Sequence, residues 1–379
     1  MHGAPGGAGP VLDHFNQAAV EKYLQRMSGE MERAWGPEGH LGDHIRSLFC
    51  DSIELKGASW TGDFPEVFAT RRGYEIRPYL PFVLLKEEEV PRALRETLKA
   101  VRYDYSLTLA EIFEERFIIP YHRWCNEHGC QSRYQAYGYP WLYTHMIDGY
   151  LIPDIPEGDQ WLFNGAWQPF SNVDDIRYAI WNKYTSSAAH LKGAKVVSTE
   201  AMTNTKGVFE ASLEYIKQAT DLNIATGINH LVLHGFNYSP PEAEFPGRVQ
   251  FGTWYHEKNP WWPYVKHWMD YAARLSHLLQ QGEAVSQLAI LGPTTDIWGS
   301  SGLDRNAFNL QPWYLHALWQ AASHHGYNSD YLSERVLEKA EFTENSTMQC
   351  MKMEYNALLV CDVLTLPPAV AEKIASLAA

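Results

Sequence analysis

The stretch KVVSTEAMTNTKGVFEASLEYIKQATDLNIATGINHLVLH, residues 195–234, decides the fold class. It begins with a β-branched run over residues 195–200, continues with a helical pattern over 212–226 and returns to an apolar run over 228–234. A strand, a helix and a second strand in this order are typical of parallel strands joined by a crossover helix. The stretch therefore predicts an α/β protein.

The same alternation extends in both directions from this unit. The patterns predict strands over residues 11–15, 47–55 and 130–136, and helices over 17–35, 64–72, 90–128, 174–192 and 263–281. Residues 138–170 are rich in Pro and Gly, which predicts mostly loop with a short strand leading to Ile155. Six or seven strands, each followed by a helix or a long loop, favour a (β/α)8 TIM-barrel-like catalytic domain over a doubly wound sheet.

A second α/β unit is predicted after Gly282. Strand patterns at 287–291 and 357–360 alternate with helical patterns at 312–324 and after Pro367-Pro368. This order indicates the start of a flavodoxin-like, glutamine-amidotransferase-like α/β domain. We therefore expect a (β/α)8-like catalytic domain over 1–283 and a partial α/β domain over 284–379. The abrupt ends suggest a fragment of a longer chain, and residues 1–7 lack the features of a signal peptide.

Composition excludes several classes of partner. The 379 residues carry a formal net charge of -14, which disfavours nucleic acid, because a phosphate backbone requires a basic footprint. No apolar run is long enough to span a membrane. Five cysteines without metal-site spacing are expected to be buried, reduced thiols. Aromatic residues reach 13%, a surplus that is common where sugar rings are stacked.

Three predicted strand ends carry carboxylates. They are DSIE at 51–54, DIPE at 154–157 and Glu200 after Val196-Val197-Ser198-Thr199. Two carboxylates held by separate strands are what hydrolysis of a glycosidic bond needs, one as acid and one to activate water or attack the sugar. A third acidic group nearby suits a hard cation with oxygen ligands.

Each of these residues also has a structural interpretation. Glu54 by itself fits an ion pair to a helix lysine or arginine better than a catalytic role, and Asp51 would face the opposite side of a regular strand. Glu157 follows a proline and fits a turn as well as a ligand role. Glu200 has no packing reason to end its strand. His234 ends an apolar strand in a plausible substrate-facing position, and Trp254 either walls a sugar pocket or packs its loop.

An ordered set of motifs resembles glycoside hydrolase family 106, the α-L-rhamnosidases. The motifs are DSIE (51–54), WT (60–61), RRGY (71–74), YLP (79–81), RYQAYG (133–138), DIPE (154–157), SSAAH (186–190), STEAMT (198–203), GINH (227–230), HG (234–235), YSP (238–240) and NPWW (259–262). They keep their order over the whole predicted barrel.

The resemblance implies an inverting exo-hydrolase that removes α-L-rhamnose from glycans or glycosides, with calcium in its active site. Glu54 and Glu200 would be the catalytic acid and base, about 6.5–9.5 Å apart. Glu157 would be a calcium ligand or substrate contact. The remaining residues that we expect at the substrate are Asp51, Trp60, Gln135, Tyr137, His190, His234 and Trp254.

Three positions depart from the family pattern. Gly158-Asp159 stands where a longer acidic residue is expected, Tyr137 where His is expected, and Met202 where an aromatic residue is expected. Two alternatives stay open, a retaining β-galactosidase-like barrel and a non-catalytic carbohydrate-binding barrel fragment. The family resemblance favours a periplasmic or secreted location, which the sequence itself does not determine.

Overall fold

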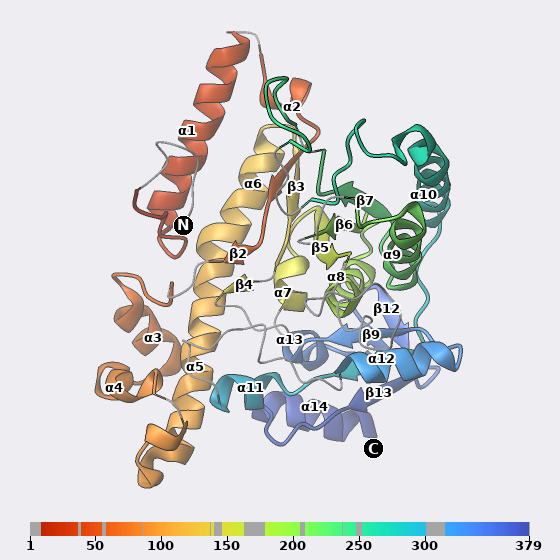
Figure 1. Cartoon of the computed structure of the whole chain (residues 1–379). Coiled ribbons are helices and arrows are strands. Elements are labelled where there is room, and N and C mark those ends of the chain that lie inside the picture. Colours follow the sequence, from red (N-terminus) through yellow and green to blue (C-terminus); the bar gives the residue numbers. More distant parts are fainter. Residues whose placement is uncertain are drawn as a thin grey trace.

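A curled sheet of parallel strands lies at the centre of the molecule (Figure 1). The computed structural model describes residues 9–36, 39–54, 58–85, 87–136, 138–139, 146–162, 179–204, 209–236, 238–247, 252–300 and 315–378. Within these ranges the sheet has five strands, in the order β1 (Ser47–Cys50), β3 (Gln131–Tyr134), β5 (Ile155–Trp161), β6 (Ser198–Thr203) and β7 (His230–Leu233). Neighbouring strands follow one another along the chain with helices between most of them, which confirms the predicted α/β class.

Most predicted helices form where the sequence places them. Asn16 begins α1 (Gln17–Trp35) by accepting a hydrogen bond from the Ala19 amide, and Gly36 ends it. α3 (Phe64–Arg72) ends at Gly73 in the left-handed conformation. Ser212 caps α9 (Leu213–Ala225) through the Tyr215 amide. Two shorter helices are α2 (Leu41–His44), which contacts α1, and α4 (Leu80–Val83).

The long helical pattern before the second strand of the sheet is one bent rod. α5 (Arg95–Phe113) passes through a π-helical turn, Glu114–Ile118, into α6 (Ile119–Glu127). Pro120 lies in the first turn of α6, where its missing N–H and fixed φ are compatible with the π-helical turn before it. α8 (Ala179–Lys192) packs on β5, and α10 (Val265–Leu279) packs on α9 (Figure 1).

Three predicted strands differ from the structure. Residues 11–15 form a turn, because the Asp13 carboxylate accepts the Phe15 amide and the Thr61 hydroxyl. The predicted strand 47–55 breaks after Cys50 and resumes as β2 (Ile53–Glu54), which pairs with β4 (Gly138–Tyr139). The expected short strand that leads to Ile155 instead begins there and continues to Trp161, after the unpredicted helix α7 (Met146–Tyr150).

The C-terminal part contains a second parallel sheet. Its strands lie in the order β13 (Ala357–Val360), β8 (Leu288–Leu291) and β9 (Ser329–Leu332), with α11 (Thr294–Ser300), α12 (Leu315–His324), α13 (Glu334–Glu338) and α14 (Pro368–Ala378) around it. No sequence pattern predicted β9 or the small antiparallel sheet of β10 (Glu341–Phe342), β11 (Met348–Cys350) and β12 (Met353–Tyr355).

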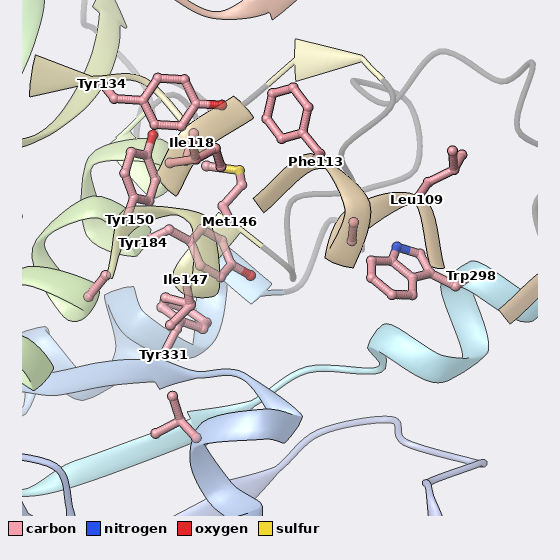
Figure 2. Packing of buried hydrophobic residues seen from close by; sticks show 14 of the residues in the cluster. Leu109, Phe113, Ile118, Tyr134, Met146, Ile147, Tyr150, Tyr184, Trp298 and Tyr331 are labelled. Atoms are coloured by element: carbon pink, nitrogen blue, oxygen red, sulfur yellow. The ribbon is translucent and has the colours of Figure 1, made fainter. Parts of the chain in front are cut away.

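The two sheets share one hydrophobic core. α8 lies between them, and its Tyr184 ring packs 4.6 Å from Tyr331 of β9, beside Met146 and Ile147 of α7 (Figure 2). Trp298 of α11 packs near Leu109 of α5 in the same cluster (Figure 2). The C-terminal unit is therefore packed tightly against the helices of the central sheet, while the domain boundary at 283/284 stays a prediction.

The sequence predicted no membrane-spanning segment and buried, reduced thiols. Among the described helices, none is long and apolar enough to cross a bilayer. All five cysteines are free: Cys125, Cys130 and Cys350 are buried, and Cys50 and Cys361 are half-buried. The expectation of free thiols is confirmed, and that of full burial holds for three of them.

Candidate active site

Two carboxylates of β5 lie on the face of the strand that looks away from α8. Glu157 and Asp159 are two residues apart and share this face. Gly158, between them, faces α8: a Cβ there would lie 2.2 Å from Asn182 Oδ1, so only glycine fits. Asp159 is in register with Glu200 on β6, which brings the carboxylates of two strands together.

Glu200 lies within β6 and not at the strand end that the sequence predicted, and three side chains hold it. The Gln135 amide donates to Oε2 at 2.8 Å, the Thr203 hydroxyl donates to Oε1 at 3.1 Å, and His234 Nδ1 lies 2.8 Å from Oε1. Burial opposes the ionisation of Glu200. The hydrogen bonds from His234 and Gln135 outweigh burial, however, so the pKa of Glu200 lies below its ordinary value. This carboxylate is ionised and oriented.

His234 responds to the same contact in the opposite direction. Its hydrogen bond to Glu200 raises the imidazole pKa above its ordinary value, and the charges of Asp159 and Asp51 act in the same direction. The ring is 40% exposed, so it reaches both the carboxylate and the solvent-facing side of the site. The sequence analysis placed His234 at the substrate, and the structure joins it to Glu200.

Glu157 has a different environment, deep in the sheet. Its side chain is fully buried, Ser198 donates a hydrogen bond to Oε2 at 2.6 Å, and Arg133 Nε lies 3.1 Å from the same oxygen. The Arg133 guanidinium also lies 4.4 Å from the centre of the Phe49 ring. Burial raises the pKa of Glu157 to about 7, although Arg133 and Ser198 act against it. Glu157 therefore lies within its strand and not at the strand end that the sequence predicted.

Asp51 occupies the break between β1 and β2. Its Oδ1 accepts the backbone amide of Ser52 at 2.7 Å, which interrupts the regular strand. Partial burial and repulsion from Glu200 raise the pKa of Asp51 above its ordinary value. Glu54 follows on β2, whose backbone pairs with Tyr139. The irregular strand end that a catalytic role requires is thus present.

The other predicted substrate residues are distributed more widely. Gln135 contacts Glu200, whereas Trp60 is 43% exposed and packs against Phe64. Trp254 is buried beneath other aromatic rings. His190 lies at the end of α8, with Nδ1 2.9 Å from Asp330 of β9, so the structure does not bring it to Glu200. Tyr137 and the side chain of Glu54 lie outside the described residues.

Three contributors to the site were assigned no role from sequence. They are Arg133, Ser198 and Thr203, which bind Glu157 or Glu200. Asp159 was noted only as a departure from the family pattern. The signal that could have found it is the two-residue spacing from Glu157, which puts both carboxylates on one face of a strand.

A metal site is not assembled by the described residues. No group of three or more His, Cys, Asp or Glu side chains among them is arranged to hold an ion. Oε2 of Glu157 already contacts Ser198, and the Arg133 guanidinium beside it supplies positive charge. The predicted role of Glu157 as a calcium ligand or substrate contact therefore stays a prediction.

The arrangement suits acid and base catalysis by two carboxyl groups. The environment lowers the pKa of Glu200 and raises the pKa of its neighbours Asp51 and Glu157. This difference in pKa allows one carboxylate to accept a proton while another carboxyl group retains its own. This is the requirement of acid and base catalysis in bond hydrolysis.

Sequence comparison finds a family for the whole chain. The sequence pattern of glycoside hydrolase family 106, described as alpha-L-rhamnosidase, matches residues 2–379. A curated protein of Formosa agariphila, named "Putative beta-glucuronidase", is 28% identical over 293 residues, which are 76% of this chain and 23% of that protein.

Structural comparison finds similar folds among glycosidases. A rhamnosidase from Novosphingobium sp. PP1Y matches with a TM-score of 0.73 and 24% identity over 100% of this chain and 34% of its own. A beta-galactosidase from Marinomonas ef1 matches with a TM-score of 0.56 and 11% identity over 96% of this chain and 58% of its own. At these identities the likeness concerns the fold, and the chain spans about a third of the rhamnosidase.

Proposed function

Because the chain belongs to glycoside hydrolase family 106, the alpha-L-rhamnosidases, we propose that it hydrolyses terminal α-L-rhamnosyl bonds of glycans or glycosides. The observation that carries this proposal is the anchored carboxylate of Glu200. Gln135, Thr203 and His234 hold both of its oxygens, beside carboxyl groups of raised pKa. Family membership supports the choice of sugar, and the site supports hydrolysis.

The proposed mechanism uses Glu200 as the base. Its ionised carboxylate removes a proton from water as the water attacks the anomeric carbon. Glu54, from the first strand-end segment, protonates the leaving oxygen on the opposite side of the sugar ring. Gln135 and Thr203 donate to Glu200 and keep it oriented during proton transfer. Direct attack by water inverts the configuration at the anomeric carbon.

The two parallel sheets support a proposal for the folds to which they belong. We propose that its five sequential parallel strands are part of a (β/α)8 barrel, and that the C-terminal sheet is the start of a flavodoxin-like domain. The strand order supports the first part, since neighbours in a barrel follow one another along the chain. The order β13-β8-β9 supports the second part, because the second and third strands lie on either side of the first.

The function is tested by release of the aryl group from an aryl α-L-rhamnopyranoside. We expect turnover, and proton NMR of the first product is expected to show the inverted anomer. Calcium dependence, which rests on family membership alone, predicts loss of turnover in excess chelator and recovery with added calcium. Binding of the glycoside without turnover would favour a carbohydrate-binding protein. The retained anomer would favour a β-galactosidase-like mechanism.

Replacement of His234 by Ala is expected to move the acidic limb of the kcat/KM profile to higher pH. His234 donates the hydrogen bond and positive charge that lower the pKa of Glu200, so without it Glu200 accepts a proton at a higher pH. The measurement is kcat/KM from pH 3 to 8, with replacement of the exposed His324 by Gln as control. An unmoved acidic limb would show that His234 does not tune the base.

A further inference from the structure

Four aromatic side chains are exposed on the loops that follow β6 and β7. Phe236 is 57% exposed, Tyr238 76%, Phe245 66% and Phe209 40%. Large apolar side chains gathered on a surface cost free energy in water, and such patches commonly mark binding sites. We call Phe209, Phe236, Tyr238 and Phe245 the aromatic rim.

The aromatic rim is built on a buried stack of rings. The Phe236 ring stacks on His256 with centroids 5.2 Å apart, and His256 stacks on Trp254 at 5.7 Å. Phe209 meets Trp254 edge to face at 4.4 Å and stacks on Phe245 at 5.7 Å. The Phe236 backbone also forms a bridge with Tyr255. The rings of Phe209, Phe236 and Phe245 are therefore held in place, so a ligand would lose little of its binding energy in ordering them.

The aromatic rim is continuous with the candidate active site. Phe236 follows His234 by two residues, and His234 contacts both Glu200 and Thr203 at the end of β6. The loop that carries Trp254 is tied to the same strand, because the Thr253 hydroxyl donates to the Met202 carbonyl oxygen. The rim therefore lies beyond the carboxyl ends of β6, which carries the proposed base, and of the neighbouring β7.

The exposure of the rim and the charges beside it indicate which class of ligand it binds. Its residues are 40–76% exposed, whereas the side chain of Glu200 is only 16% exposed, so a sugar ring on the rim stays partly in solvent while the cleaved bond lies deeper. Exposed Glu242 and Glu244 lie in the same loop and disfavour an anionic ligand. The apolar faces of neutral pyranose rings suit aromatic surfaces.

From this geometry we propose that the aromatic rim is a leaving-group subsite that stacks a neutral pyranose ring of an oligosaccharide or polysaccharide. This inference rests on the proposed rhamnosidase function, and it assigns oligosaccharides or polysaccharides as the preferred substrates. In this proposal the terminal sugar lies at Glu200, and the next sugar of the chain lies against the exposed rings of the aromatic rim.

The test compares two substrates in the wild type and in Phe236→Ala and Phe245→Ala. The first is a neutral α-L-rhamnosyl disaccharide, and the second is α-L-rhamnosyl fluoride, whose leaving group has no ring. We expect the ratio of kcat/KM for the disaccharide to that for the fluoride to fall about tenfold in each variant, the equivalent of about 1.4 kcal/mol. Phe342→Ala, at a Phe that is 51% exposed on β10, is the matched control and should leave the ratio unchanged.

The outcomes separate the subsite from the function. A ratio unchanged in both variants, with wild-type melting temperatures, would overturn the subsite and leave the hydrolase proposal standing. A change of oligomeric state in the variants without a change of ratio would assign the rim to a protein contact. If the wild type hydrolyses neither substrate, the proposed function fails. Calorimetry of disaccharide binding then tests the subsite. A Kd about tenfold higher in both variants supports the subsite, and an unchanged Kd or no detectable binding overturns it.

Discussion

Replacement of Glu200 by Gln is expected to lower kcat by about 100- to 10,000-fold, the range that a positioned general base contributes. Gln keeps the size of the side chain but cannot accept the proton of the attacking water. The contacts to Gln135, Thr203 and His234 involve both oxygens of Glu200, so local rearrangement is checked by the melting temperature. Steady-state rates on an aryl α-L-rhamnoside and calorimetric binding of the same compound measure the two effects separately.

The control is Glu283→Gln, at an exposed residue outside the site. Wild-type turnover in Glu200→Gln would refute the assignment of the base. The acid is tested in the same assay by comparing Glu54→Gln with Asp51→Asn. Both residues belong to the first strand-end segment, and Asp51 has the raised pKa that an acid requires. We expect the larger loss in Glu54→Gln, and a larger loss in Asp51→Asn would transfer the acid role to Asp51.

Replacement of Asp330 by Ala is expected to lower the free energy of unfolding by about 3–5 kcal/mol, the usual cost of removing one partner of a buried ion pair. Asp330 is fully buried, and the Lys183 ammonium donates to it at 2.9 Å. His190 Nδ1 lies 2.9 Å from the same oxygen, and the Tyr355 hydroxyl donates to the other at 3.2 Å. These contacts join α8 to the C-terminal unit, so the variant leaves a charged lysine without its partner inside the core.

Urea denaturation measures the effect. The double variant Lys183→Met with Asp330→Ala should recover part of the loss, because it also removes the unpaired charge. Asp270→Ala, which breaks an exposed ion pair with Lys266, is the control and should change stability little. If Asp330→Ala and Asp270→Ala lower the free energy of unfolding equally, Asp330 does not stabilise the packing between the two sheets.

The same residue predicts a pH dependence of stability. Lys183 and His190 outweigh the burial of Asp330 and hold its pKa well below the ordinary 3.8. A carboxyl group whose pKa is depressed on folding stabilises the protein above its unfolded pKa, and this stabilisation is lost as the pH falls. The stability gap between wild type and Asp330→Ala should therefore be full above pH 5 and shrink below pH 4.

The parts of the fold predicted from sequence are those that local rules control. Helix α1 follows from Asn16, Gly36 and the apolar spacing between them, and α3 ends at Gly73 as a left-handed cap does. β5 could not be predicted in the same way, because IPEGDQW has no apolar alternation. Its side chains are buried by neighbouring strands and α8, and no local pattern encodes that burial.

The candidate site likewise has parts that the sequence indicated and parts that only the tertiary structure decided. By itself the sequence indicated the α/β class and singled out Glu200 and His234, which the structure brings into contact. Only the tertiary structure decided that Gln135, Thr203 and His234 orient Glu200, that Glu157 pairs with Arg133, and that His190 belongs to the core with Asp330. Side-chain partners depend on which strands become neighbours and in which register, and those contacts form between residues far apart in the chain.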